Sequence, residues 1–135
     1  MDIQLASKLR AVANGNGRFA PEAFSFLYEA LPYAVELAGK QDAEGTERHV
    51  TGQEVLSGMR AFASKLFGPL AAPVWRSWGI QSTLDWGEVV FMLVDAGLLR
   101  RQETDTKEDF RDGFDFDEAF VEAYRVELDA VEGKS

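Results

Sequence analysis

The chain has 135 residues, no cysteine, an apolar content of 46% and a formal net charge of −9 at pH 7. This length and composition predict one globular domain over residues 1–135, and the lack of cysteine excludes disulfides, thiolate metal ligands and a cysteine nucleophile. A negative net charge disfavours nucleic-acid binding, because that binding depends on basic side chains that contact phosphates.

Helical spacing of apolar residues predicts a first helix over residues 3–12, ended by the Asn- and Gly-rich run at 14–17. A second helix should begin near Pro21, since proline suits a first helical turn, and end at Gly39. Pro32 lies inside this pattern and is expected to kink the helix or divide it.

Residues 40–49 are mostly polar and lack an apolar period, so we expect a mobile loop there. The next helix has a clear start signal, because Thr51 and Glu54 have the spacing of a capping box. That helix should end at the Gly-Pro pair of residues 68–69.

A short helix is predicted over residues 70–78, with Pro73 tolerated in its first turn. A longer helix over residues 83–96, with Gly97 as its stop, has a wide apolar face that places it in the core. Its charged residues are all acidic: Asp85, Glu88 and Asp95.

After this helix the pattern changes. Residues 100–111 are polar, and Phe114 and Phe116 alternate with aspartates, as in a strand with one buried face. Two antiparallel strands joined across residues 104–109 would form a wing, and Asp117 would then cap a last helix. We therefore predict a mainly α (α+β) fold: a helical domain with a small antiparallel β-hairpin in a winged-helix-like arrangement.

Five blocks of the sequence resemble a bacterial family of small single-domain proteins to which no activity is attached. The blocks are RFAPEAFSFLYEAL (18–31), RHVTGQEVL (48–56), FGPLA (67–71), WGIQSTLDWGEVVFMLVDAGLL (78–99) and the paired DF and FDFDEAF (109–120). The run at 14–17 and Pro32 depart from that family, both at loop or kink positions. A looser resemblance, in the order helix, helix, Gly-Leu-Leu and polar hairpin, is to winged-helix transcription factors, and it implies no function by itself.

Two groups of residues are candidates for binding a protein. Trp75, Trp78 and Trp86 lie around a Pro- and Gly-containing turn and would either form an apolar pocket or groove, or simply belong to the core. Asp112 and Asp115 belong to the acidic wing, which is either a solvated face or a docking surface for a basic partner.

Other candidate sites are weaker. His49, the one histidine, could act as a general base but is better explained by a structural role near a helix start. The acidic run at 109–118 fails the EF-hand pattern, because its glycine falls fifth rather than sixth. Arg100 and Arg101 are the residues that a DNA-binding wing would use.

The sequence contains no phosphate loop, catalytic elbow or metal-binding helix motif, so we expect no cofactor and no metal, and an enzyme built on carboxylates is the least favoured interpretation. The expected function is a non-catalytic protein-interaction module or adaptor subunit; the alternative is a winged-helix DNA-binding regulator. We expect a protein partner and leave a homodimer open, and we expect neither nucleic acid nor membrane as a partner.

The sequence has no apolar run of the roughly 18 residues that span a bilayer. We therefore expect a cytoplasmic location.

Overall fold

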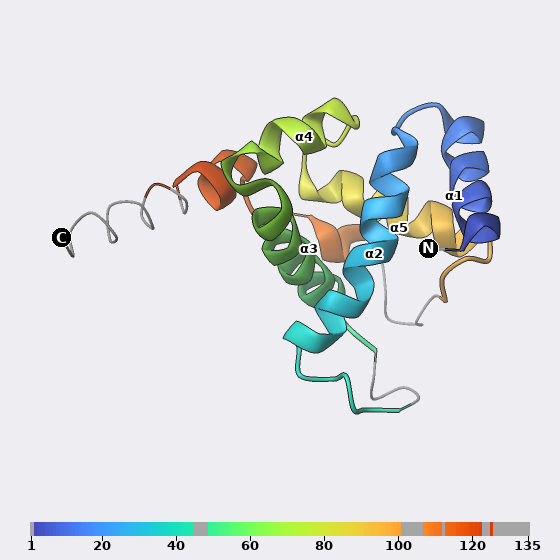
Figure 1. Cartoon of the computed structure of the whole chain (residues 1–135), viewed down its shortest axis with the longest axis horizontal. Helices are drawn as coiled ribbons and strands as arrows, with labels where there is room; N and C mark the ends of the chain where they lie inside the picture. Colours follow the sequence, from blue (N-terminus) through green and yellow to red (C-terminus); the bar gives the residue numbers. More distant parts are fainter. Residues whose placement is uncertain (1, 45–48, 101–106, 112, 123–124, 126–135) are drawn as a thin grey trace.

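The computed structural model describes residues 2–44, 49–100, 107–111, 113–122 and 125. Within these residues the protein is helical, and its elements are α1 (Ile3–Asn16), α2 (Pro21–Leu37), α3 (Gly52–Phe67), the 3-10 helix η2 (Gly68–Leu70), α4 (Ala71–Ser77), α5 (Thr83–Asp95), the 3-10 helix η3 (Lys107–Phe110) and the π-helix η4 (Asp117–Glu122). Figure 1 shows α1, α2 and α3 side by side in an up–down–up order, with α4 across one end and α5 behind them.

The first helix is longer than local signals predict, and the second is not divided. Helix α1 continues through the Asn-Gly-Asn run to Asn16, and the chain leaves the helix only at Gly17, whose φ of 71° places it in the left-handed region. Asn and Gly are poor helix residues, but a last turn tolerates them, so the predicted end at residue 12 is wrong. Pro32 does not divide α2, which begins at Pro21 as predicted.

The predicted capping box at the start of α3 is confirmed. Thr51 Oγ1 accepts a hydrogen bond from the Glu54 backbone N at 3.1 Å, and Glu54 Oε1 accepts one from the Thr51 backbone N at 3.0 Å. Lys40 Nζ also donates to Glu54 Oε1, at 2.9 Å. The hydrogen bond from the Thr51 backbone, with the one from Lys40, holds the pKa of Glu54 below its usual value of 4.5.

Helices α2 and α3 approach each other closely. Gly58 of α3 faces Ala34 of α2, and a Cβ atom on Gly58 would overlap the Ala34 side chain and its Cα atom. Both residues are buried. The absence of a side chain at Gly58 therefore sets the spacing of the two helices.

An aromatic cluster occupies the centre of the core. Trp75 and Trp86 are fully buried, with ring centroids 5.1 Å apart in an edge-to-face arrangement. Phe116 and Phe120 also lie edge-to-face against Trp75, at 5.1 and 5.0 Å. Neither indole Nε1 has a hydrogen-bond partner among the described residues. Edge-to-face packing sets the positive edge of one ring against the negative face of another, which favours this arrangement.

The predicted β-hairpin wing is wrong. No strand occurs in the described part of the chain: residues 107–110 form η3, and residues 113–115 belong to no helix or strand. Phe116 is buried against Trp75 and Phe114 is half-buried beside it, so their alternation with aspartates reflects packing on helices. A two-residue period shows which side chains face the core, but not whether a neighbouring strand supplies backbone hydrogen bonds. The fold is therefore mainly α, and residues 101–106 lie outside the described residues.

The last described element also begins differently from the prediction. Asp115, rather than Asp117, caps it, because Asp115 Oδ1 accepts a hydrogen bond from the Glu118 backbone N at 2.9 Å. Asp117 instead forms an ion pair with Arg76, at 3.1 Å. The two aspartates thus anchor this segment, one at its own start and one to α4.

Candidate functional site

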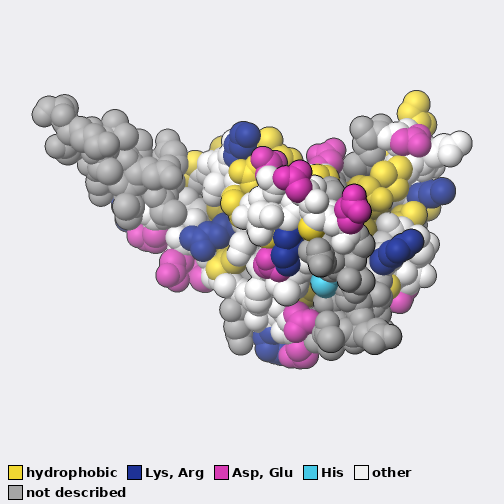
Figure 2. All heavy atoms as spheres, turned by 90° about the horizontal axis from the view of Figure 1, so that it is seen from below, with side chains coloured by type: hydrophobic (Ala, Val, Ile, Leu, Met, Phe, Trp, Pro, Cys, Tyr) yellow, Lys and Arg dark blue, Asp and Glu magenta, His cyan; other side chains and the backbone are white. Residues whose placement is uncertain are grey.

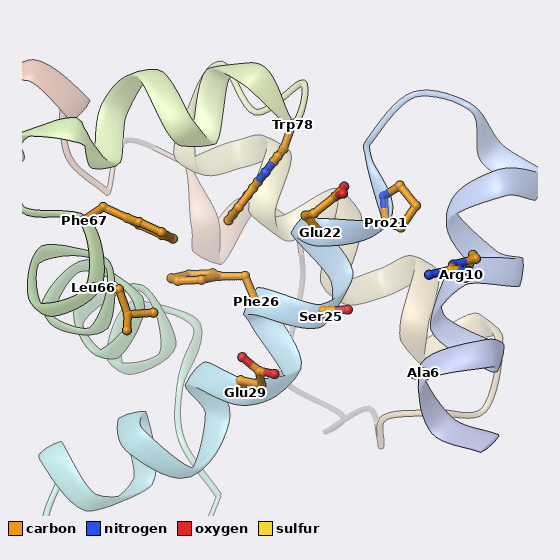
Figure 3. A pocket seen from close by; sticks show the side chains of 10 residues that line it. All are labelled: Ala6, Arg10, Pro21, Glu22, Ser25, Phe26, Glu29, Leu66, Phe67 and Trp78. Atoms are coloured by element: carbon orange, nitrogen blue, oxygen red, sulfur yellow. The ribbon is translucent and has the colours of Figure 1, made fainter. Parts of the chain in front are cut away.

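A groove of about 290 Å³ crosses the N-terminal half of α2. Helix α1 flanks it on one side, and the end of α3 with the turn after α4 flanks it on the other (Figure 3). The lining residues are Ala6, Arg10, Pro21, Glu22, Ser25, Phe26, Glu29, Leu66, Phe67 and Trp78. The groove thus joins segments far apart in the sequence.

Aromatic rings form the floor of the groove on the α3 side. Phe26 points from α2 toward Phe67 and Trp78 (Figure 3), with ring centroids 6.2 and 5.6 Å away. Phe67 and Trp78 meet edge-to-face at 6.1 Å. Phe26 is buried, whereas Phe67 and Trp78 are only half-buried and so present apolar surface to the groove.

Local sequence explains why this surface stays open. Leu66 is 52% exposed at the last turn of α3, because Gly68 ends that helix with a φ of 55°. Trp78 follows the last residue of α4, and Gly79, with a φ of 92°, turns the chain away. Both apolar side chains thus lie at the end of an α-helix, where the chain changes direction.

Charged side chains border the apolar floor. Glu22 and Glu29 project from α2 on the face that also presents Phe26, since the three positions follow helical spacing. Arg10 lies across the groove on α1 (Figure 3). All three are exposed. The border therefore has two carboxylates and one guanidinium, and it is acidic beside the aromatic floor.

An ion pair between exposed Arg18 and buried Asp85 links the turn before α2 to α5. Arg18 donates to Asp85 Oδ1 at 2.9 Å, and the Gln81 backbone N donates to Asp85 Oδ2 at 2.8 Å. Asp85 is buried, so the paired geometry and the second hydrogen bond offset the cost of removing its charge from water. Asp85 therefore has a structural role.

The structure separates the three tryptophans. Trp75 and Trp86 belong to the core, as one of the two interpretations of the sequence had it, and only Trp78 lines the groove. Phe26 and Leu66 were not recognised from the sequence as site residues. Each lies on the apolar face of its helix. The neighbouring sequence does not show which positions of that face are buried and which are exposed.

The described acidic and basic candidate residues, Asp115 and Arg100, do not line the groove. Asp115 caps η4, and Asp112 lies outside the described residues. Arg100 is exposed and lines a different pocket, between α2, α3 and α5, while Arg101 lies outside the described residues.

His49 also lies at that second pocket, half-buried, and its backbone oxygen accepts a hydrogen bond from Lys40 Nζ at 2.8 Å. Within the described residues no three His, Cys, Asp or Glu side chains lie close enough together to hold a metal ion. None of the described helices has the length and apolar character needed to cross a membrane.

No protein-family model, curated protein or solved structure matches the chain.

Proposed function

We propose that the protein is a non-catalytic interaction module that binds a short, basic, amphipathic segment of a partner protein in the groove across α2. The main support is the apolar floor, where Leu66, Phe67 and Trp78 keep exposed or half-exposed surface between two helices. Apolar side chains that line a concave surface lose their unfavourable contact with water when a partner covers them. Aromatic residues, tryptophan above all, are also frequent anchors of protein interfaces.

The border of the groove favours a basic partner. Glu22 and Glu29 lie beside the aromatic floor, and the whole chain has a net charge of −9. Lys or Arg beside the apolar residues of a bound segment would meet these carboxylates, and the overall field would speed its approach. An amphipathic helix in a groove is a frequent form of this recognition.

The alternative interpretation, DNA binding, depended on a wing and on basic residues beside it. The described residues contain no strand, and Arg100 does not lie in the groove. On the face in Figure 2, Lys and Arg side chains are interspersed with Asp and Glu and do not form a basic stripe. We therefore do not propose DNA binding. The cytoplasmic location expected from the sequence stays a prediction.

A matched pair of leucine variants tests the groove. The wild-type protein is used to select from a random peptide display library, and the enriched peptides are then measured against Leu66→Glu and Leu70→Glu. Leu66 lines the groove, whereas Leu70 is 64% exposed and does not line it. We expect peptides with aromatic or aliphatic anchors and Lys or Arg, with binding lost in Leu66→Glu and kept in Leu70→Glu.

A second pair tests the charge. Glu29→Lys should weaken binding of the selected basic peptides, and Glu36→Lys should not, because Glu36 is exposed on the same helix but outside the groove. Enrichment of acidic peptides, or equal binding by both leucine variants, would contradict the proposal. A dimer in sedimentation that Leu66→Glu alone converts to a monomer would show that a second copy occupies the groove instead.

A further inference from the structure

A second, more enclosed apolar pocket lies between the C-terminal half of α2, the start of α3 and the end of α5. Its volume is about 170 Å³. The residues that line it are Leu31, His49, Val50, Gly52, Val55, Val90, Phe91, Leu99, Arg100 and Phe110. None of them lines the groove across α2, so the two sites can be tested separately.

Two glycines allow η3 to close one wall of this pocket. A Cβ atom on Gly87 of α5 would lie 3.0 Å from Phe110 Cβ, and one on Gly52 of α3 would lie 3.2 Å from Phe110 Cε2. Such distances are too short for ordinary packing, so only glycine lets the Phe110 ring lie this close to both helices. Phe110 is buried as a result. The wall is thus held by tight packing on both helices.

Most residues that line the pocket are apolar, and one is basic. That residue, Arg100, is also the one exposed residue among the described lining residues. Among those same residues there is no Asp or Glu, although the chain as a whole has 23 of them against 14 Lys and Arg. The described residues that line the pocket therefore include one basic side chain and no acidic one.

The volume limits the ligand to a small group. Apolar cavities of about 150 Å³ lined by aliphatic and aromatic side chains remain dry and bind ligands of the size of benzene. A cavity of about 170 Å³ has room for a ring of that size or a chain of similar volume. Val, Leu and Phe side chains make up most of its lining beside His49, Gly52 and Arg100, so entry of an apolar group is favoured by the hydrophobic effect.

We propose that this pocket binds a small monocarboxylate, with its apolar body among Val55, Val90 and Phe110 and its carboxylate at Arg100. A guanidinium binds a carboxylate through two parallel hydrogen bonds, one to each oxygen. An alcohol offers only one, uncharged oxygen, and an ammonium group has no acceptor. The proposal is independent of the proposed function of the groove, since the two sites have no residue in common.

The test uses hexanoate, with hexan-1-ol and hexylammonium as matched probes of the same chain length. Each is titrated into the folded protein while amide chemical shifts are recorded. Hexanoate should bind saturably with shifts at Val55, Val90 and Leu99, hexan-1-ol should bind more weakly, and hexylammonium should not bind. Shifts confined to Ser25 and Leu66 would place the ligand in the groove and overturn the proposal.

Two variants separate the charge from the cavity. Arg100→Gln should weaken hexanoate binding by roughly tenfold, the loss expected for a charge-assisted hydrogen bond, and leave hexan-1-ol unchanged. Val90→Phe should fill the pocket and abolish binding of both probes. The control is Arg60→Gln, since Arg60 is an exposed arginine on α3 that lines neither this pocket nor the groove. No saturable binding of hexanoate, or equal affinities for hexanoate in wild type and Arg100→Gln, would overturn the proposal.

Discussion

Helices α1 and α3 both lie against α2, but they are held in different ways. Helix α3 begins with a reciprocal capping box and crosses α2 so closely that Gly58 meets Ala34. Helix α1 buries only Leu9 and Ala13 among its residues, and its residues Ala6 and Arg10 stay exposed along the groove. The close contact specifies the fold, and the looser one leaves room for the groove.

The largest expected effect comes from filling the α2–α3 contact. Gly58→Ala should lower the free energy of unfolding by about 1–3 kcal/mol, because the added methyl group overlaps Ala34 and forces the helices apart. Urea denaturation followed by circular dichroism measures the change.

The matched control is Gly15→Ala in α1. Gly15 lies inside that helix, and a Cβ atom there meets nothing within 4 Å. Alanine should therefore stabilise the protein slightly, by roughly 0.5 kcal/mol, since glycine is the poorer helix former. Equal effects of the two substitutions would mean that α3 packs no more closely than α1.

A smaller difference is expected between the helix caps. Thr51→Ala should cost about 1 kcal/mol, because it removes the oxygen that accepts from the Glu54 backbone N. Asp2→Ala removes the corresponding cap of α1, where Asp2 Oδ1 accepts from the Gln4 backbone N at 2.9 Å, and should cost less because an edge helix can fray there. Thermal or urea unfolding of both variants gives the ranking, and a larger loss for Asp2→Ala would reverse the comparison.

The smallest expected effect is a change in how stability depends on pH. The pKa of Glu54 lies below 4.5 in the folded protein, so its contribution to stability is present above that pH and is lost as the pH falls through the lowered pKa. The free energy of unfolding should therefore fall less between pH 6 and pH 3.5 in Glu54→Gln than in the wild type. Lys40→Met should show part of the same change, because Lys40 is the second cause of the lowered pKa. If both variants had the same pH dependence of stability as the wild type, the charge of Glu54 would add nothing to the stability of the capping box.

The features predicted correctly from the sequence are those that depend only on residues close together in the chain. Thr51 and Glu54 identify the start of α3 because the two hydrogen bonds of a capping box need only four consecutive positions. Pro21 identifies the start of α2 for a similarly local reason, since its fixed φ suits a first turn.

The wing and the groove could not be predicted in this way. The two-residue alternation of Phe114 and Phe116 arises from contacts with Trp75, about 40 positions earlier in the chain. Likewise, Phe26 and Trp78 become neighbours only when α2 and the end of α4 meet. Trp78 could be recognised as a candidate because tryptophan is common at interfaces, but the sequence could not separate it from Trp75 and Trp86.

The separation of the tryptophans gives the groove an optical signal of its own. Trp75 and Trp86 are enclosed by the core, so dissolved quenchers reach their rings only when the protein opens, whereas the half-buried ring of Trp78 meets whatever enters the groove. Fluorescence that iodide or acrylamide removes from the native protein therefore comes mainly from Trp78. A partner that covers the groove would shield that emission without any added label.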